Sequence, residues 1–179
     1  MNRSTATPLQ DYPWYAADKW EGLEQGDILL DCPVLIPTEE LTPLLIDARS
    51  DITSQEAVGI RLYDLVIMSQ SCDLAQDNID QVLLCAFFPA SNLNSDKRIA
   101  VMKERMPSQH MIEACVLNGH EFERQVIDFR TIYTLPKAFV SRFVEKMGKR
   151  IRLLPPYREH LSQSFARYFM RVGLPRPLK

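Results

Sequence analysis

The residues best suited to chemistry lie in the segment VIMSQSCDLAQD, residues 66–77. An apolar, strand-like stretch runs directly into Ser69, Cys72 and Asp73, which are the candidate catalytic residues. A thiol beside a carboxylate suits three roles: a nucleophile, a pair of metal ligands, or the polar end of a strand. In the third role the serines and Asp73 hydrogen-bond local backbone and cap a turn or a short helix that begins at Leu74, while Cys72 fills space.

A nucleophilic cysteine needs a histidine or another positive charge nearby, which lowers the pKa of its thiol. The chain has three histidines, His110, His120 and His160, and the sequence places none of them beside Cys72. The neighbouring carboxylate acts in the opposite direction, because a negative charge raises a thiol pKa. A metal site lacks placed partners in the same way. We therefore expect neither a metal nor a cofactor.

Other enzyme signatures are missing from the sequence. It contains no G-x-S-x-G, no P-loop, no G-x-G-x-x-G and no H-E-x-x-H. The four cysteines are widely spaced and form no C-x-x-C pair, which favours reduced thiols. The longest apolar run, VLLCAFF, is too short to span a bilayer, and the N-terminus lacks the apolar core of a secretory signal. These features predict a cytoplasmic protein without a membrane segment.

Charge is divided unevenly along the chain. Residues 130–179 contain 12 Lys and Arg against only Glu145 and Glu159, whereas residues 1–129 contain 9 Lys and Arg against 21 Asp and Glu. Such a division indicates a basic surface for nucleic acid, an anionic protein partner, or neutralisation by the acidic part of the same chain. If the basic part faces outward, the residues that bind nucleic acid are Arg150, Arg152, Arg158, His160, Arg167 and Arg171.

The clearest predicted element is a helix over residues 157–172. Prolines precede it, Gly173 ends it, and apolar residues recur at intervals of three and four, at Tyr157, Leu161, Phe165, Phe169 and Val172. This stripe packs against a core or against another protein chain. A different face carries His160, Ser164, Arg167 and Arg171, and it is either solvated or in contact with phosphates.

The remaining pattern is β-rich. Strands are predicted at residues 26–37, 41–48, 59–70, 81–89 and 126–136, and helices at 91–106 and 136–149. Residues 150–154 are too short to assign. The expected fold class is α+β: a β-rich, SH3-like small barrel with inserted helices and a C-terminal helical extension. Residues 1–135 form the barrel-like domain with an N-terminal arm, and residues 136–179 form a basic helical extension packed on it.

The order QGDILL, DLVIMSQ, VLLCAFF resembles the strand series of the MazF/PemK-type family, small SH3-like barrels that act as toxin endoribonucleases. The resemblance covers roughly residues 25–90 and rests on short motifs. Ser69 matches the serine that ends the family's second strand. The family's catalytic arginine falls near Tyr63 and Asp64, with Arg61 displaced by two positions, and its threonine falls at Phe88-Pro89. The resemblance therefore implies the barrel, but it carries over only one of the positions used in RNA cleavage.

Three hypotheses of function follow. The first is a nucleic-acid-associated accessory protein of bacterial toxin or defence type, which binds RNA or DNA through its basic C-terminal region. The second is a protein-interaction subunit, or a homo-oligomer, assembled through the 157–172 helix. The third is a MazF-like ribonuclease or a cysteine-dependent enzyme that uses Ser69, Cys72 and Asp73.

Overall fold

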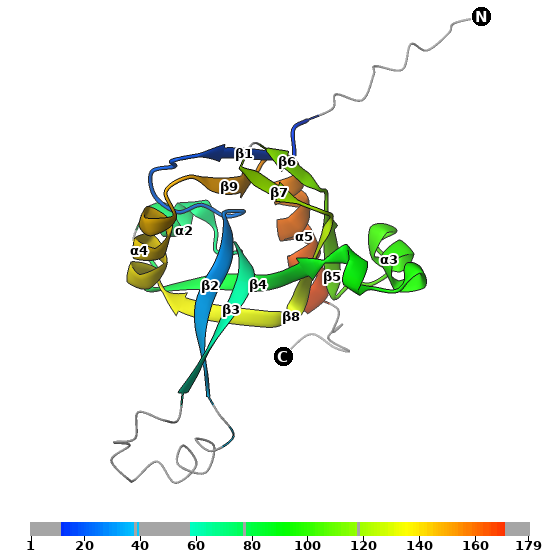
Figure 1. Ribbon diagram of the computed structural model, residues 1–179, viewed down its shortest axis with the longest axis horizontal. Coiled ribbons are helices and arrows are strands. Elements are labelled where there is room, and N and C mark those ends of the chain that lie inside the picture. The colour runs from blue at the N-terminus through cyan, green and yellow to red at the C-terminus, as the bar shows by residue number, and fades with distance from the viewer. Residues whose placement is uncertain (1–11, 38, 40–57, 77, 118, 171–179) are drawn as a thin grey trace, which may run out of the picture.

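A five-stranded antiparallel sheet forms the centre of the molecule (Figure 1). The computed structural model describes residues 12–37, 39, 58–76, 78–117 and 119–170. The strand order in the sheet is β2 (Ile28–Pro37), β3 (Val58–Ile67), β4 (Gln81–Pro89), β8 (Gln125–Pro136) and β5 (Gln109–Ile112). Two smaller antiparallel pairs lie against it: β1 (Tyr15–Asp18) with β9 (Arg150–Leu153), and β6 (Cys115–Leu117) with β7 (His120–Phe122).

Helices connect and cover these strands. They are α2 (Ser71–Ala75), α3 (Ser95–Met102), α4 (Lys137–Met147) and α5 (Tyr157–Phe169), with a 3-10 turn at Ala90–Asn92. The side chain of Asn94 caps α3 by accepting from the backbone N–H of Lys97, and Gly148 ends α4 with a φ of 76°. None of the helices in the described part of the chain has the length and apolarity needed to cross a membrane.

The mixed α+β class and the β-rich core are confirmed. Among the described residues, the strand pairings do not close the sheets into a barrel. Four of the five predicted strands correspond to β2, β3, β4 and β8, and the three predicted helices to α3, α4 and α5. The strand predicted at residues 41–48 lies outside the described residues.

The two faces of the sheet pack into two cores. In β4, Leu84 and Ala86 belong to one cluster, and Cys85 and Phe87 belong to the other, because successive side chains of a strand point to opposite faces. This is why the β4 sequence is continuously apolar. Helix α4 covers the first cluster through Val140 and Val144. The pair β1–β9 and helix α5 cover the second, so the basic C-terminal residues share their cores with the acidic part of the chain.

Gly26 and Asp27 form the junction where β2, β3 and β9 meet. Gly26 has a φ of 87°, and a Cβ there would lie 3.1 Å from the carbonyl oxygen of Leu153, so only glycine fits easily. Asp27 is fully buried. Its carboxylate accepts hydrogen bonds from Nε of Arg150 at 3.0 Å and from Nε of Arg152 at 2.5 Å.

The expectation that Arg150 and Arg152 face outward is therefore wrong. Their exposed fractions are 2% and 5%. Arg150 also donates to the backbone carbonyls of Trp20 and Gly22, and Arg152 stacks on the ring of Trp20 and pairs with Glu24. A buried charge needs a partner of opposite sign, and the acidic N-terminal part of the same chain supplies it.

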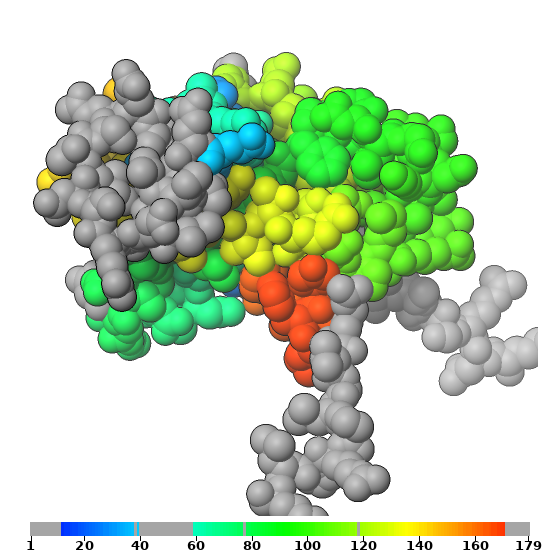
Figure 2. Space-filling model, turned by 90° about the horizontal axis from the view of Figure 1, so that it is seen from below, coloured from blue at the N-terminus to red at the C-terminus, as the bar shows by residue number. Residues whose placement is uncertain are grey.

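The apolar stripe of α5 packs on the protein's own core. Tyr157 stacks on Trp14 with ring centroids 3.6 Å apart, Leu161 is fully buried, and Phe165 meets Phe129 edge to face. Figure 2 shows α5, in orange-red, alongside the yellow β8. This packing leaves little of the described stripe for a partner, and within it Phe169 is the exposed exception. Val172 lies outside the described residues.

Candidate functional site

The SQSCD segment links the end of β3 to α2. The hydroxyl of Ser69 accepts a hydrogen bond from the backbone N–H of Leu83 in β4, at 2.8 Å, and that of Ser71 accepts from the backbone N–H of Gln25. Helix α2 begins at Ser71 rather than Leu74, and no side chain caps it. The serines thus tie the strand end to neighbouring elements, and the prediction of local capping is wrong.

Cys72 is exposed, so it does not fill space in the core as expected. It lines a cavity of about 330 Å³, called here the strand-end pocket. Arg158 of α5 lies in the same pocket, where it donates to the carboxylates of Glu24 at 3.2 Å and Glu159 at 3.0 Å. Nearest to the thiol in sequence, Asp73 is 3.8 Å from Sγ. The other described residues that line this pocket are Gln25, Gln70, Ser71, Ser162 and Gln163.

No histidine is among the described residues that line the strand-end pocket. The predicted catalytic group is therefore split. Ser69 bonds to β4, whereas Cys72 lines a pocket with Arg158, whose guanidinium is already paired with two carboxylates. The polar lining suits a hydrogen-bonded ligand better than a cysteine nucleophile, because no described histidine lies there to activate the thiol and the carboxylates of Glu159 and Asp73 are weak bases toward it.

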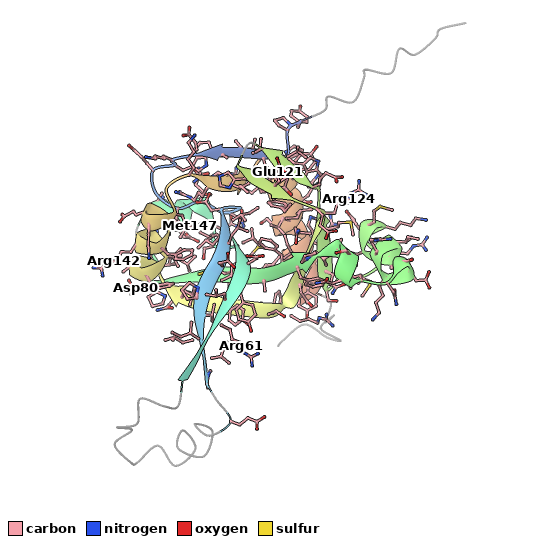
Figure 3. The ribbon with its side chains drawn as sticks, viewed as in Figure 1. Arg61, Asp80, Glu121, Arg124, Arg142 and Met147 are labelled. Carbon is pink, nitrogen blue, oxygen red and sulfur yellow. The ribbon has the colours of Figure 1, made fainter. Side chains whose placement is uncertain are left out.

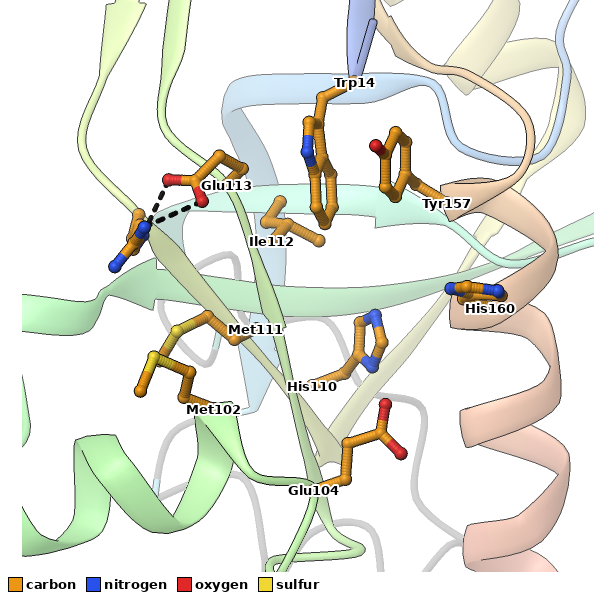
Figure 4. A pocket seen from close by; sticks show the side chains of 10 residues that line it. Trp14, Met102, Glu104, His110, Met111, Ile112, Glu113, Tyr157 and His160 are labelled. Atoms are coloured by element: carbon orange, nitrogen blue, oxygen red, sulfur yellow. Dashed lines mark hydrogen bonds and ion pairs between the residues drawn. The ribbon is translucent and has the colours of Figure 1, made fainter. Parts of the chain in front are cut away.

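Two of the histidines line a different cavity, on the opposite side of α5 from the strand-end pocket. A cavity of about 320 Å³ lies between the end of α3, strand β5 and the start of α5. His110 projects into it from β5 and His160 from α5, with the stacked rings of Trp14 and Tyr157 next to them (Figure 4). The other residues that line it are Met102, Glu104, Met111, Ile112, Glu113 and Arg124.

A second cavity of about 220 Å³ shares Glu104 and His110 with the first. Its other lining residues are Met106, Pro107, Gln109, Ser164 and Arg167. Together the two cavities form what is called here the histidine groove. Tyr157, His160, Ser164 and Arg167 line it from α5 at the three- and four-residue spacing of one helix face.

The predicted polar face of α5 thus lines the histidine groove through His160, Ser164 and Arg167, while Arg171 lies outside the described residues. Of the six predicted nucleic-acid-binding residues, Arg150 and Arg152 are buried and Arg158 is in the strand-end pocket. His160 and Arg167 are both exposed. Helix α5 therefore places Arg158 at one site and His160 and Arg167 at another.

Burial and charge set the electrostatics of the groove. His110 is half-buried, which lowers its pKa to about 4; Glu104 opposes this shift and His160 adds to it. Its imidazole is therefore neutral at pH 7. Glu113 is held by a bidentate ion pair with Arg124, at 2.6 and 2.9 Å, and these hydrogen bonds lower the pKa of Glu113.

Glu104 stands out in its backbone. Its φ is 54°, a left-handed conformation that costs a residue with a side chain about 1 kcal/mol or more. The residue follows α3, faces His110 in Figure 4, and lines both cavities. The conformation belongs to the end of α3: the backbone N–H of Glu104 donates to the carbonyl of Val101 and that of Arg105 to the carbonyl of Ala100, the pattern of a Schellman motif.

Sequence reasoning missed Trp14, Glu104 and His110 as site residues. Strand β5, which carries His110, is too short to show a period. The one sequence feature that pointed to this site is the presence of three histidines, but their positions relative to one another depend on the fold. Among the described residues, no group of three His, Cys, Asp or Glu side chains is arranged to hold a metal ion. Comparison of the sequence with protein-family models and with curated proteins found no match.

Proposed function

We propose that the protein binds single-stranded nucleic acid, in particular RNA, along the histidine groove. The observation that carries this proposal is the row Tyr157, His160, Ser164 and Arg167 on one face of α5, opposite His110. Aromatic rings, hydrogen-bonding side chains and cations in one groove are the usual means of holding unpaired bases and their phosphates.

Charge near the groove supports the same proposal. Arg167 contacts only the side-chain oxygen of Gln163, at 3.5 Å, and forms no ion pair with a described residue. Lys103 and Arg105 flank Glu104, are exposed, and likewise form no ion pair within the described part of the chain. Arg124 neutralises Glu113. Cations that are free of intramolecular partners can release counterions from phosphates, which is the main source of nucleic-acid affinity.

The proposal implies a cytoplasmic location, where RNA is present and thiols stay reduced. It also keeps a toxin or defence role as an expectation, which growth measurements during expression in a bacterial host would test. For the fold, we propose a distorted SH3-like barrel of the MazF/PemK type. Support comes from the order of Gly26-Asp27, β3 and β4, and from the bridge between Asp27 and Arg152, which brings β9 beside β2.

Fluorescence anisotropy with labelled single-stranded RNA tests the function. Affinity should fall steeply between about 50 and 200 mM salt, and duplex DNA should bind more weakly. Arg167→Ala should reduce the slope of log K against log salt by about 0.7, the value for one phosphate of a single strand. Arg142→Ala is the matched control, because Arg142 is an exposed arginine on α4, on the opposite side of the molecule from Arg124 (Figure 3). Equal effects of the two substitutions, or an affinity independent of salt, would contradict the proposal.

A second candidate function is self-association, favoured by a different surface. A groove of about 690 Å³ runs between the β2–β3 pair, β8 and α4, and its lining includes Leu35, Ile60 and Phe139. Leu35 and Ile60 are about two-thirds exposed, at 67% and 68%, and exposed apolar clusters often mark protein interfaces. Light scattering on Leu35→Asn and on the control Val116→Asn, which changes an exposed valine of β6, tests it. Only Leu35→Asn should dissociate an oligomer; a monomeric wild-type protein excludes this function.

A further inference from the structure

Cys72 differs from the other three cysteines in what surrounds its thiol. The thiol is exposed and lines the strand-end pocket, whereas Cys32, Cys85 and Cys115 are buried. An accessible thiol exchanges with small disulfides and retains one half of each as a mixed disulfide. The contacts that the pocket makes with the retained half then decide which small thiol is bound most stably.

The wall of this pocket contains a hydrogen-bond acceptor without a partner. Gln25 is only 6% exposed, and its side-chain nitrogen donates to the backbone carbonyl of Met68 at 2.9 Å. This bond fixes which end of the amide is nitrogen and which is oxygen. No described residue donates to the side-chain oxygen of Gln25, and this oxygen is not buried as the unpaired oxygens of Gln109 and Gln125 are. Because Gln25 lines the strand-end pocket, its oxygen is open to a donor there.

Carboxylates gather around the thiol as well. Asp73 lies 3.8 Å from Sγ of Cys72 and forms no ion pair with a residue in the described part of the chain. Glu159 lines the pocket. Arg158, the one cation among the described lining residues, is already paired with Glu24 and Glu159. The pocket therefore suits a molecule that brings N–H donors and a positive charge.

We propose that Cys72 is a site of reversible modification by low-molecular-weight aminothiols, which carry an ammonium group two carbons from the sulfur. The thiolate of Cys72 attacks one sulfur of an aminothiol disulfide, so that a bond to Sγ forms while the bond between the two aminothiol sulfurs breaks. The second sulfur leaves as a thiolate and takes up the proton that Cys72 released. The aminothiol disulfide is thus the oxidant, and a free aminothiol is the reduced product. This inference is independent of the proposed function.

The ammonium group is the part of the ligand that the pocket recognises. In the mixed disulfide it lies only a few bonds from Sγ, in the same cavity as the open oxygen of Gln25 and beside the carboxylates of Asp73 and Glu159. An ammonium has three N–H donors for these acceptors. A hydroxyl in its place has one donor and no charge, and a carboxylate in its place is repelled by the acidic side chains.

The test equilibrates the reduced full chain with three disulfides that differ in their end group: 2-aminoethyl, 2-hydroxyethyl and 2-carboxyethyl disulfide. Each is mixed with its own thiol at the same fixed ratio. Mass spectrometry of the intact chain gives the modified fraction, and fragmentation locates the modification. We expect a single modification, at Cys72, with an equilibrium constant about tenfold larger for the amine than for the alcohol and smallest for the acid. Unfolding the chain in urea should abolish this preference.

Two variants assign the preference to the pocket. Asp73→Asn removes the charge beside Sγ while keeping the shape of the side chain, and it should lower the preference for the amine by about threefold. Gln25→Met removes the open acceptor and should lower it similarly, with circular dichroism as the check that this variant is folded. Asp80→Asn is the control, because Asp80 is an exposed acid that does not line the pocket. Equal constants for the three disulfides, a preference that persists in urea, or an unchanged preference in Asp73→Asn would each overturn the proposal.

Discussion

Arg152 holds Asp27 in a buried, two-pronged ion pair, with its Nε 2.5 Å from Oδ1 and its Nη2 3.1 Å from Oδ2. The two residues lie 125 positions apart in the chain. The pair joins the start of β2 to β9, and Arg150 binds the same carboxylate from the same strand. The acidic and basic parts of the chain thus neutralise each other in part, through ion pairs inside the molecule.

Removal of this carboxylate should be strongly destabilising. Asp27→Asn leaves the buried guanidinium of Arg150 without a counter-charge and that of Arg152 with only the part-exposed carboxylate of Glu24. We expect a loss of about 3–5 kcal/mol in the free energy of unfolding. Urea denaturation measures it. Asp80→Asn changes an exposed acid of the same type and should cost less than about 0.5 kcal/mol. Similar small losses in both variants would mean that the ion pairs of Asp27 contribute little to the free energy of unfolding.

Thiol chemistry should distinguish Cys72 from the other cysteines. All four cysteines are free, and Cys32, Cys85 and Cys115 are buried. Burial also raises the pKa of Cys85 to about 12, which keeps its thiol protonated and slow to react. A disulfide reagent should therefore label a single thiol rapidly in the native protein. Labelling that persists after Cys72→Ala would contradict the exposure of the strand-end pocket.

Stability should fall in mild acid because of His110. Its pKa is about 4 in the folded state and about 6.5 when unfolded, so the unfolded chain binds the proton first as the pH falls. The stabilisation from its neutral form is complete above pH about 6.5 and is lost progressively toward pH 4. The expected loss is about 1–3 kcal/mol, reduced by solvent screening of a half-buried ring.

Denaturation curves at several pH values measure this loss. His110→Gln should flatten the dependence between pH about 6.5 and 4, whereas His120→Gln should retain it. Glu113 and Asp128 also have lowered pKa values, but carboxylates of this kind lose their stabilising charge at still lower pH. An unchanged pH dependence in His110→Gln would show that His110 is not the group responsible.

The long elements of the fold could be predicted because their patterns repeat. Strand β4 is apolar on both faces, since both face a core, and α5 has an apolar stripe over several turns. Strands β1, β5, β6, β7 and β9 have only three or four residues each, which is too few to show a period.

The two sites were harder to predict for the same reason that Arg150 and Arg152 were misplaced. In the sequence RIRL the arginines alternate with apolar residues, which is typical of a strand with one solvent-exposed face. In the structure all four residues are buried. Whether such a charge points inward depends on a partner that is distant in the chain. The polar face of α5 could be predicted from its spacing, but its partner His110 depends on the position of β5.

The central claim is that RNA occupies the histidine groove, and photocrosslinking tests it most directly. Single-stranded RNA containing 4-thiouridine is irradiated with the protein, and the crosslinked peptides are identified by mass spectrometry. We expect crosslinks within residues 102–113 and 157–167, on the two sides of the groove. Crosslinks confined to α4 or to the β2–β3 pair, or an unchanged pattern in the His160→Gln Arg167→Ala double variant, would contradict the claim.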